Sequence, residues 1–229
     1  FIGTVSHELR TPLTSLRLAL QMMKVAPTVE KREQYRDLAL RQCDRQIELV
    51  SDLLNLQRLQ SDHYERTVEP IDLTAVFADL VREIRPTARQ REQTIVTEIP
   101  DSLPPFCGDR VGLERIVREL LVNASKYSSP GSHIVLNLRV WQNSIIILVR
   151  NPGEILETEL PKIFHKFYRI PHLDRWNRGG TGLGLALIHQ LVGVMGGTVR
   201  AFNRDGWIHL EVQLPDALTV LPPDRAIEP

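Results

Sequence analysis

The sequence predicts a long helical hairpin followed by an α/β sandwich, and three observations lead to that fold class. Two apolar seams near the start have the three- and four-residue gaps of helices that pack in a bundle. A polar stretch that ends at Pro70 then separates this part from the rest. Beyond it, strand-like apolar segments are mixed with amphipathic helices, as in α/β or α+β sandwiches. We therefore expect two domains, a hairpin over residues 1–66 and an α/β domain over residues 67–229.

The hairpin is predicted from its two seams. The first seam comprises Ile2, Val5, Leu9, Leu13, Leu16, Leu20 and Met23. The second comprises Leu40, Cys43, Ile47, Val50 and Leu54. Between them, Ala26-Pro27-Thr28 breaks the helix, and Thr28 or Glu30 suits the start of the next one. A lone two-helix hairpin buries little apolar area, so we expect a homodimer in which two copies form a four-helix bundle.

The elements of the α/β domain follow from periodicity. Residues 61–70 are expected to be a linker, and residues 73–88 a helix that Pro86 ends early. A strand is expected at 94–99 and a strong amphipathic helix at 110–127. Further expected elements are a β-hairpin at 133–140 and 144–149, a helix at 183–195, strands near 198–203 and 207–214, and a frayed tail after Pro215.

Composition restricts the class of protein. The 28 basic and 28 acidic residues give a formal net charge of zero, which argues against a nucleic-acid binder. Cys43 and Cys107 fit neither a metal site nor a disulfide framework, so we expect reduced thiols in the cytoplasm. No apolar run approaches 18 residues. Because the chain starts at Phe1 inside a helical pattern, we expect a fragment whose sensor region or membrane anchor lies upstream.

One histidine on the first helix has the position of an exposed nucleophile. On a helical wheel His7 lies roughly 160° from the centre of the seam, and Thr11 shares its face. Pro12 lacks an N–H, so the helix can bend beside the imidazole. A neutral imidazole is a good nucleophile at physiological pH, and Glu8 is the candidate base.

Two motifs in the second half have the chemistry of a nucleotide site. Asn123, Lys126 and Tyr127 are spaced three and four residues apart on the helix expected at 110–127, so they can share a face. An amide oxygen suits Mg²⁺ and an ammonium suits phosphate. The string Gly179-Gly180-Thr181-Gly182-Leu183-Gly184 comes just before a helix, where glycines allow phosphates to approach free N–H groups. It matches neither a P-loop nor a Rossmann pattern.

These motifs together resemble sensor histidine kinases. Ser6-His7-Glu8-Leu9-Arg10-Thr11-Pro12-Leu13 is similar to the phospho-acceptor motif of that family, and residues 118–127 are similar to its asparagine motif. Residues 163–169 and 179–187 resemble the phenylalanine motif and the second glycine box. The resemblance covers residues 1–215 and implies a dimerisation and phospho-acceptor hairpin joined to an ATP-binding sandwich of the GHKL type.

The resemblance implies a role for each matching residue. His7 would be phosphorylated from ATP, Glu8 would assist proton transfer, and Thr11 would orient water during dephosphorylation of the partner. That partner would be the receiver domain of a response regulator. The implied nucleotide-binding residues are Asn123, Lys126, Tyr127, Asn151, Gly153, Arg169, Gly180, Thr181, Gly182, Leu183 and Gly184. Asn123 would bind Mg²⁺. Residues 168–180 would be a lid over ATP, with positive charge from Arg169, Arg175 and Arg178, although such residues could equally be idle surface.

Three places in the sequence depart from the family pattern. Glu119 replaces an asparagine, and its carboxylate could be a metal ligand or a general base. The adenine box lacks its aspartate: a gapless alignment puts Arg150 there, and a one-residue deletion puts Asn151 there with Gly153 in the glycine role. We prefer Asn151, because its side-chain oxygen can accept the adenine amino hydrogen, at a cost of roughly 1 kcal/mol for the lost charge. His209 and Ile208 also stand where Thr or Ser is usual.

Three functions remain open from the sequence. The first is a protein-histidine kinase that autophosphorylates His7. The second is a pseudokinase-like dimeric scaffold with weak ATP binding, as the altered adenine box would allow. The third is a kinase biased toward the phosphatase reaction, which would use Glu8 and Thr11.

Overall fold

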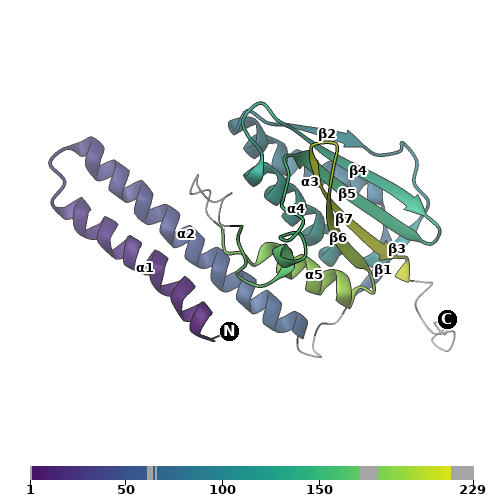
Figure 1. Cartoon of the computed structure of the whole chain (residues 1–229), viewed down its shortest axis with the longest axis horizontal. Helices are drawn as coiled ribbons and strands as arrows, with labels where there is room; N and C mark the ends of the chain where they lie inside the picture. The colour runs from purple at the N-terminus through teal and green to yellow at the C-terminus, as the bar shows by residue number, and fades with distance from the viewer. Residues whose placement is uncertain (1, 61–63, 65, 171–179, 218–229) are drawn as a thin grey trace.

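The computed structural model describes residues 2–60, 64, 66–170 and 180–217. Helices α1 (Ile2–Lys24) and α2 (Val29–Gln60) form an antiparallel hairpin that extends to one side of an α/β sandwich (Figure 1). The Thr28 hydroxyl caps α2 by accepting the Lys31 N–H at 3.3 Å. Helix α1 continues across Pro12. The two expected helices and the break between them are confirmed.

The two helices of the hairpin meet through a face of α2 that differs from the expected seam. Pro12 and Ala19 of α1 and Ala39 and Leu49 of α2 are buried. The seam residues Leu40, Ile47 and Leu54 remain 57%, 61% and 51% exposed. Spacing identifies an apolar face but does not say what covers it, and within one chain this face of α2 is uncovered.

The α/β part is a five-stranded mixed sheet with helices on one face (Figure 1). The strand order is β2-β4-β5-β7-β6, with β2 parallel to β4 and the other pairs antiparallel. The strands are β2 (Thr94–Glu98), β4 (His133–Trp141), β5 (Ser144–Pro152), β6 (Thr198–Arg204) and β7 (Trp207–Pro215). The helices are α3 (Leu73–Gln90), α4 (Arg110–Tyr127) and α5 (Gly184–Val194), with a short 3₁₀ turn η1 (Lys162–Phe164). Alternate residues of each central strand enter the core, as a sheet covered on one face requires.

Two expectations about local structure are wrong. Residues 68–70 are not linker, because β1 (Val68–Ile71) pairs antiparallel with β3 (Phe106–Asp109), a strand that the pattern did not predict. Pro86 does not end its helix, because α3 continues to Gln90. The loss of one backbone hydrogen bond at Pro86 is offset by the burial of Ile84 and Ala88, which are 6% and 0% exposed.

Some expectations fall on residues outside the described ranges. These are residues 61–63 and 65 of the expected linker, residues 171–179 of the expected lid with Arg175 and Arg178, and the tail from residue 218 onward. Among the described helices, none is long and apolar enough to cross a lipid bilayer.

Candidate functional site

The first candidate group lies on the exposed face of α1. The His7 side chain is 76% exposed, which confirms the position expected from the helical wheel. Its Nδ1 lies 3.5 Å from a carboxylate oxygen of Glu8. The Thr11 hydroxyl donates to the His7 backbone carbonyl oxygen at 3.2 Å. The carboxylate is therefore beside one ring nitrogen, and the other ring nitrogen, Nε2, lies on the opposite side of the ring.

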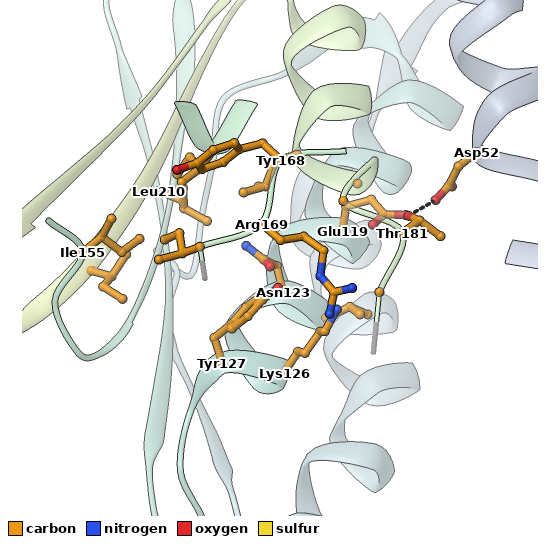
Figure 2. A pocket seen from close by; sticks show the side chains of 18 of the residues that line it. Asp52, Glu119, Asn123, Lys126, Tyr127, Ile155, Tyr168, Arg169, Thr181 and Leu210 are labelled. Atoms are coloured by element: carbon orange, nitrogen blue, oxygen red, sulfur yellow. Dashed lines mark hydrogen bonds between the residues drawn. The ribbon is translucent and has the colours of Figure 1, made fainter. Parts of the chain in front are cut away.

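The second candidate site is a pocket in the α/β part, between α4, the start of α5 and the end of the sheet (Figure 2). It brings together most of the residues that the motifs singled out. Of the expected nucleotide-binding and metal residues, the lining includes Glu119, Asn123, Lys126, Tyr127, Asn151, Arg169, Gly180, Thr181, Gly182 and Gly184. Gly153 and Leu183 are not in the lining, and neither are the three residues of the acceptor helix.

One end of the pocket is polar and is built by the glycine-rich turn before α5. Gly180 and Gly182 have φ values of +138° and +69°, which other residues rarely adopt. A Cβ at Gly180 would collide with the Lys126 ammonium, so the turn and this lysine are in close contact. The Thr181 hydroxyl accepts the Leu183 N–H at 3.2 Å. Helix α5 begins at Gly184, and its N-terminus gives this end a positive dipole.

The other end is apolar and lies against the sheet. Ile155, Tyr168 and Leu210 line it at a distance from the Lys126 and Thr181 end, as Figure 2 shows. Asn151 lines the pocket and is 3% exposed. The next residue but one, Gly153, instead donates its N–H to the Gly206 carbonyl at 3.0 Å, in the turn between β6 and β7. Ile208 lines the pocket, whereas His209 lies on the opposite face of β7, as alternation along a strand requires.

Helix α4 supplies the side chains between the two ends. Asn123, Lys126 and Tyr127 share the pocket-facing side of the helix, as their spacing predicted. Glu119, one turn earlier, points toward the start of α5, where a Cβ on Gly184 would come within 2.8 Å of its Oε2. Burial raises the pKa of the Glu119 carboxyl, and Arg115 at 2.9 Å opposes that shift.

Two carboxylates that sequence reasoning missed come from the hairpin. Glu48 and Asp52 of α2 line the polar end of the pocket. Asp52 is 3% exposed and accepts a hydrogen bond from the Thr181 hydroxyl at 3.0 Å (Figure 2). It also accepts one from Arg115 at 2.8 Å. Burial raises its pKa, and both partners oppose the shift. The available signal was a second apolar row on α2, Leu49, Leu56 and Leu59, in which Asp52 occupies the position between the first two at gaps of three and four residues.

Comparison with known proteins identifies both parts. Residues 1–62 match the family described as His Kinase A (phospho-acceptor) domain. Residues 108–217 match the family of histidine kinase-, DNA gyrase B- and HSP90-like ATPases. The chain belongs to the sensor histidine kinase family. The expected GHKL-type sandwich is thereby confirmed, and the pocket belongs to the ATPase-type domain apart from Glu48 and Asp52, which α2 contributes.

Individual relatives agree with this assignment. The signal transduction histidine-protein kinase/phosphatase MprB of Mycobacterium tuberculosis is 34% identical over 214 residues, which cover 89% of this chain and 41% of MprB. The structure of full-length ShkA in complex with AMPPNP has a TM-score of 0.70 and 26% identity, over 93% of this chain and 45% of ShkA. The histidine kinase ThkA, in complex with response regulator protein TrrA, has a TM-score of 0.76 and 19% identity, over 94% of this chain and 60% of ThkA.

This histidine kinase chain spans only part of the length of such relatives. It covers 35% of the sensor protein KinB and 34% of the sensor histidine kinase WalK.

Proposed function

We propose that this chain autophosphorylates His7 from ATP and passes the phosphoryl group to an aspartate of a response-regulator receiver domain. The observation that carries the proposal is the pairing of an exposed imidazole with a carboxylate at 3.5 Å from Nδ1. A carboxylate there holds the ring proton on Nδ1, which leaves Nε2 with its lone pair as the nucleophile. As Nε2 attacks the γ-phosphorus, the bond from that phosphorus to the β–γ bridging oxygen breaks and ADP leaves. Glu8 stabilises the positive charge that develops on the ring and can accept the Nδ1 proton.

The pocket fits ATP in one orientation. Adenine fits the apolar end, where the Asn151 side-chain oxygen can accept a hydrogen from the exocyclic amine. The phosphates fit the polar end, near the glycine-rich turn, Lys126 and Arg169. Catalysis in phosphoryl transfer is mostly positioning and charge neutralisation, and this end supplies cations for both.

Mg²⁺ is proposed at the same end of the pocket. Asn123 and Glu119 offer an amide oxygen and a carboxylate, which are hard oxygen donors that Mg²⁺ accepts alongside phosphate and water. The ion would neutralise charge on the phosphates. Glu119 is partly buried, with 22% of its side chain exposed, so it also has the setting of a general base.

The partners follow from the hairpin. Its uncovered seam, with Leu40 at 57% and Ile47 at 61% exposure, fits a second copy of the chain in a four-helix bundle. The receiver domain is proposed as the second partner because ThkA, of the same fold, is named in complex with a response regulator protein. Dephosphorylation of that regulator, with Glu8 and Thr11 near the phosphoryl group, is a proposal supported by the name kinase/phosphatase of MprB.

Labelling with γ-³²P-ATP and Mg²⁺ tests the proposal. The expected product is one label that is labile in acid and stable in base, as a phosphohistidine is. His7→Gln removes the label, whereas His133→Gln, which changes another exposed histidine, retains it. A wild-type protein that binds ATP but takes no label at millimolar ATP would instead be a dimeric scaffold.

A further inference from the structure

The most informative feature outside the expected site is the contact between α2 and the polar end of the nucleotide pocket. Helix α2 approaches α5 and the glycine-rich turn over residues 45–52. The Arg45 guanidinium donates to the Gly180 carbonyl oxygen at 3.3 Å. Asp52 accepts from Thr181 at 3.0 Å and from Arg115 at 2.8 Å. We name this set of contacts, made by Arg45 and Asp52, the α2 clasp.

The clasp occupies the Thr181 hydroxyl, a pocket-lining donor that a triphosphate would also use. A hydroxyl has one hydrogen to donate, and the hydrogen of Thr181 is directed at Asp52. The Arg115 Nη2 atom is shared between Asp52 and Glu119, at 2.8 and 2.9 Å. Two carboxylates of α2, Asp52 and Glu48, line the same end of the pocket as Lys126. Negative charge from the hairpin therefore lies where the phosphates would bring more negative charge.

Like charges that line one pocket oppose each other strongly when they are shielded from water. Asp52 is 3% exposed, so solvent screens it little. An unpaired buried carboxylate is costly, and Asp52 needs Thr181 and Arg115 to remain buried. A phosphate group that recruits Thr181 therefore removes a partner that Asp52 requires.

We infer that Asp52 competes with the ATP phosphates for the glycine-rich turn, so that nucleotide binding and release of the catalytic domain from α2 are one coupled equilibrium. This inference rests on the proposed function of the pocket. It makes Asp52 a residue that sets nucleotide affinity although it belongs to the hairpin and not to the ATPase-type domain. The coupling is reciprocal. Bound ATP weakens the contact between α2 and the turn by the same factor by which that contact weakens ATP binding, so any change that pulls α2 away raises the affinity for ATP.

The clasp is compatible with the proposed dimer because the two use different faces of α2. On a wheel, Arg45, Glu48 and Asp52 are centred roughly 130° from the centre of Leu40, Ile47 and Leu54. A third face of α2, which includes Ala39 and Leu49, packs against α1. A four-helix bundle can therefore form while the clasp is closed. Rotation of α2 within such a bundle would change the clasp directly.

The clasp also lies near the level of the acceptor histidine along the hairpin. The Gln46 side-chain amide donates to the Leu9 carbonyl oxygen at 2.8 Å, so α2 residues 45–52 run beside the first turns of α1. Opening the clasp therefore releases the polar end of the pocket close to His7, not at the far end of the hairpin.

The test measures the affinity of a non-hydrolysable ATP analogue with Mg²⁺ by calorimetry, in the whole chain. Asp52→Asn removes the charge with almost no change in volume and is expected to tighten binding by about fivefold or more. Glu48 makes no hydrogen bond to residues 180–184, the described part of the turn, so Glu48→Gln is expected to tighten binding less. Asp44→Asn, an exposed residue of the same helix, is the matched control and should leave affinity unchanged.

A second measurement separates charge competition from a simple packing effect. Hydrogen exchange of the backbone amides of residues 45–56 should speed up when the analogue binds to the wild type. In Asp52→Asn it should already be fast without the analogue. Unchanged affinity in Asp52→Asn, or exchange that does not respond to bound nucleotide, overturns the inference.

The outcomes also distinguish this inference from the proposed function. If Asp52→Asn tightens binding but no variant is labelled on His7, the coupling stands and the kinase proposal fails. If His7 is labelled normally and the affinity is the same in Asp52→Asn and wild type, the kinase proposal stands and the coupling fails. Should Asp52→Asn fold poorly by circular dichroism, Glu48→Gln alone decides, because its loss of charge leaves the hydrogen bonds of Asp52 in place.

Discussion

Helices α4 and α2 both carry a regular apolar seam, but the two seams are buried to very different extents. In α4 the residues Leu113, Ile116, Leu120 and Leu121 are all 0% exposed. In α2 the seam residues Leu40 and Ile47 are more than half exposed. The same kind of spacing thus builds a complete core in one part of the chain and an open surface in the other. The difference indicates that the α/β part is stable through its own packing, whereas the open seam of the hairpin fits the second copy of the chain proposed above.

The largest effect of a single substitution is expected in the core of the α/β part. Leu120→Ala should lower the free energy of unfolding by about 2–5 kcal/mol, because it removes buried methyl groups and leaves a cavity. Denaturant unfolding of the whole chain, followed by tryptophan fluorescence, measures the loss. Val111→Ala on the same helix is the control: its side chain is 75% exposed, and a change within about 0.5 kcal/mol is expected. Equal losses in the two variants would contradict a closed core around α4.

A smaller effect is expected from a charge on the α2 seam. Ile47→Glu should leave unfolding of the α/β part unchanged and weaken self-association by about tenfold or more, because two carboxylates then face each other in a desolvated bundle. Sedimentation equilibrium over a range of protein concentrations measures this. The control Gln34→Glu adds the same charge to an exposed position roughly 160° from the seam. A monomeric wild type, or equal association in both variants, would mean that the seam is not a dimer interface.

Sequence reasoning succeeded where one periodic pattern has one structural explanation. Two elements were expected almost as found: helix α4 at residues 110–127 and the β-hairpin formed by β4 and β5. Each has a strong period and clear ends. The short pair β1 and β3 was missed, since strands of four residues, one of which contains Pro70, carry too little pattern to differ from a loop. Pro86 misled the assignment of the end of α3 because local propensity was overridden by tertiary burial of Ala88.

The same distinction applies to the site. Residues that adjoin one another in a motif, such as Asn123 and Lys126, were expected together and line one pocket. Gly153 was assigned to the adenine box by alignment, but in the structure it does not line the pocket and donates its N–H to the Gly206 carbonyl oxygen. Asp52 was missed because its role arises from a contact across 129 positions of sequence, and no local pattern encodes such a contact. Motifs therefore predict which residues gather within a domain, and they say little about what another domain adds.

The smallest expected effect concerns function within the stable α/β part, at the adenine end of the pocket. Asn151→Asp should tighten binding of the non-hydrolysable ATP analogue by about fivefold, since a carboxylate accepts the adenine amino hydrogen with roughly 1 kcal/mol of added charge assistance. Asn151→Ala should weaken binding, because the buried acceptor is lost. Burial at 3% exposure adds a cost in the absence of nucleotide, so the free energy of unfolding of Asn151→Asp should fall slightly while its affinity rises. Calorimetry and denaturant unfolding on the same samples measure the two changes. If wild-type binding is submicromolar and Asn151→Ala does not alter it, Asn151 does not contact adenine, and the affinity of this pocket is set at its phosphate end, where α2 and the glycine-rich turn meet.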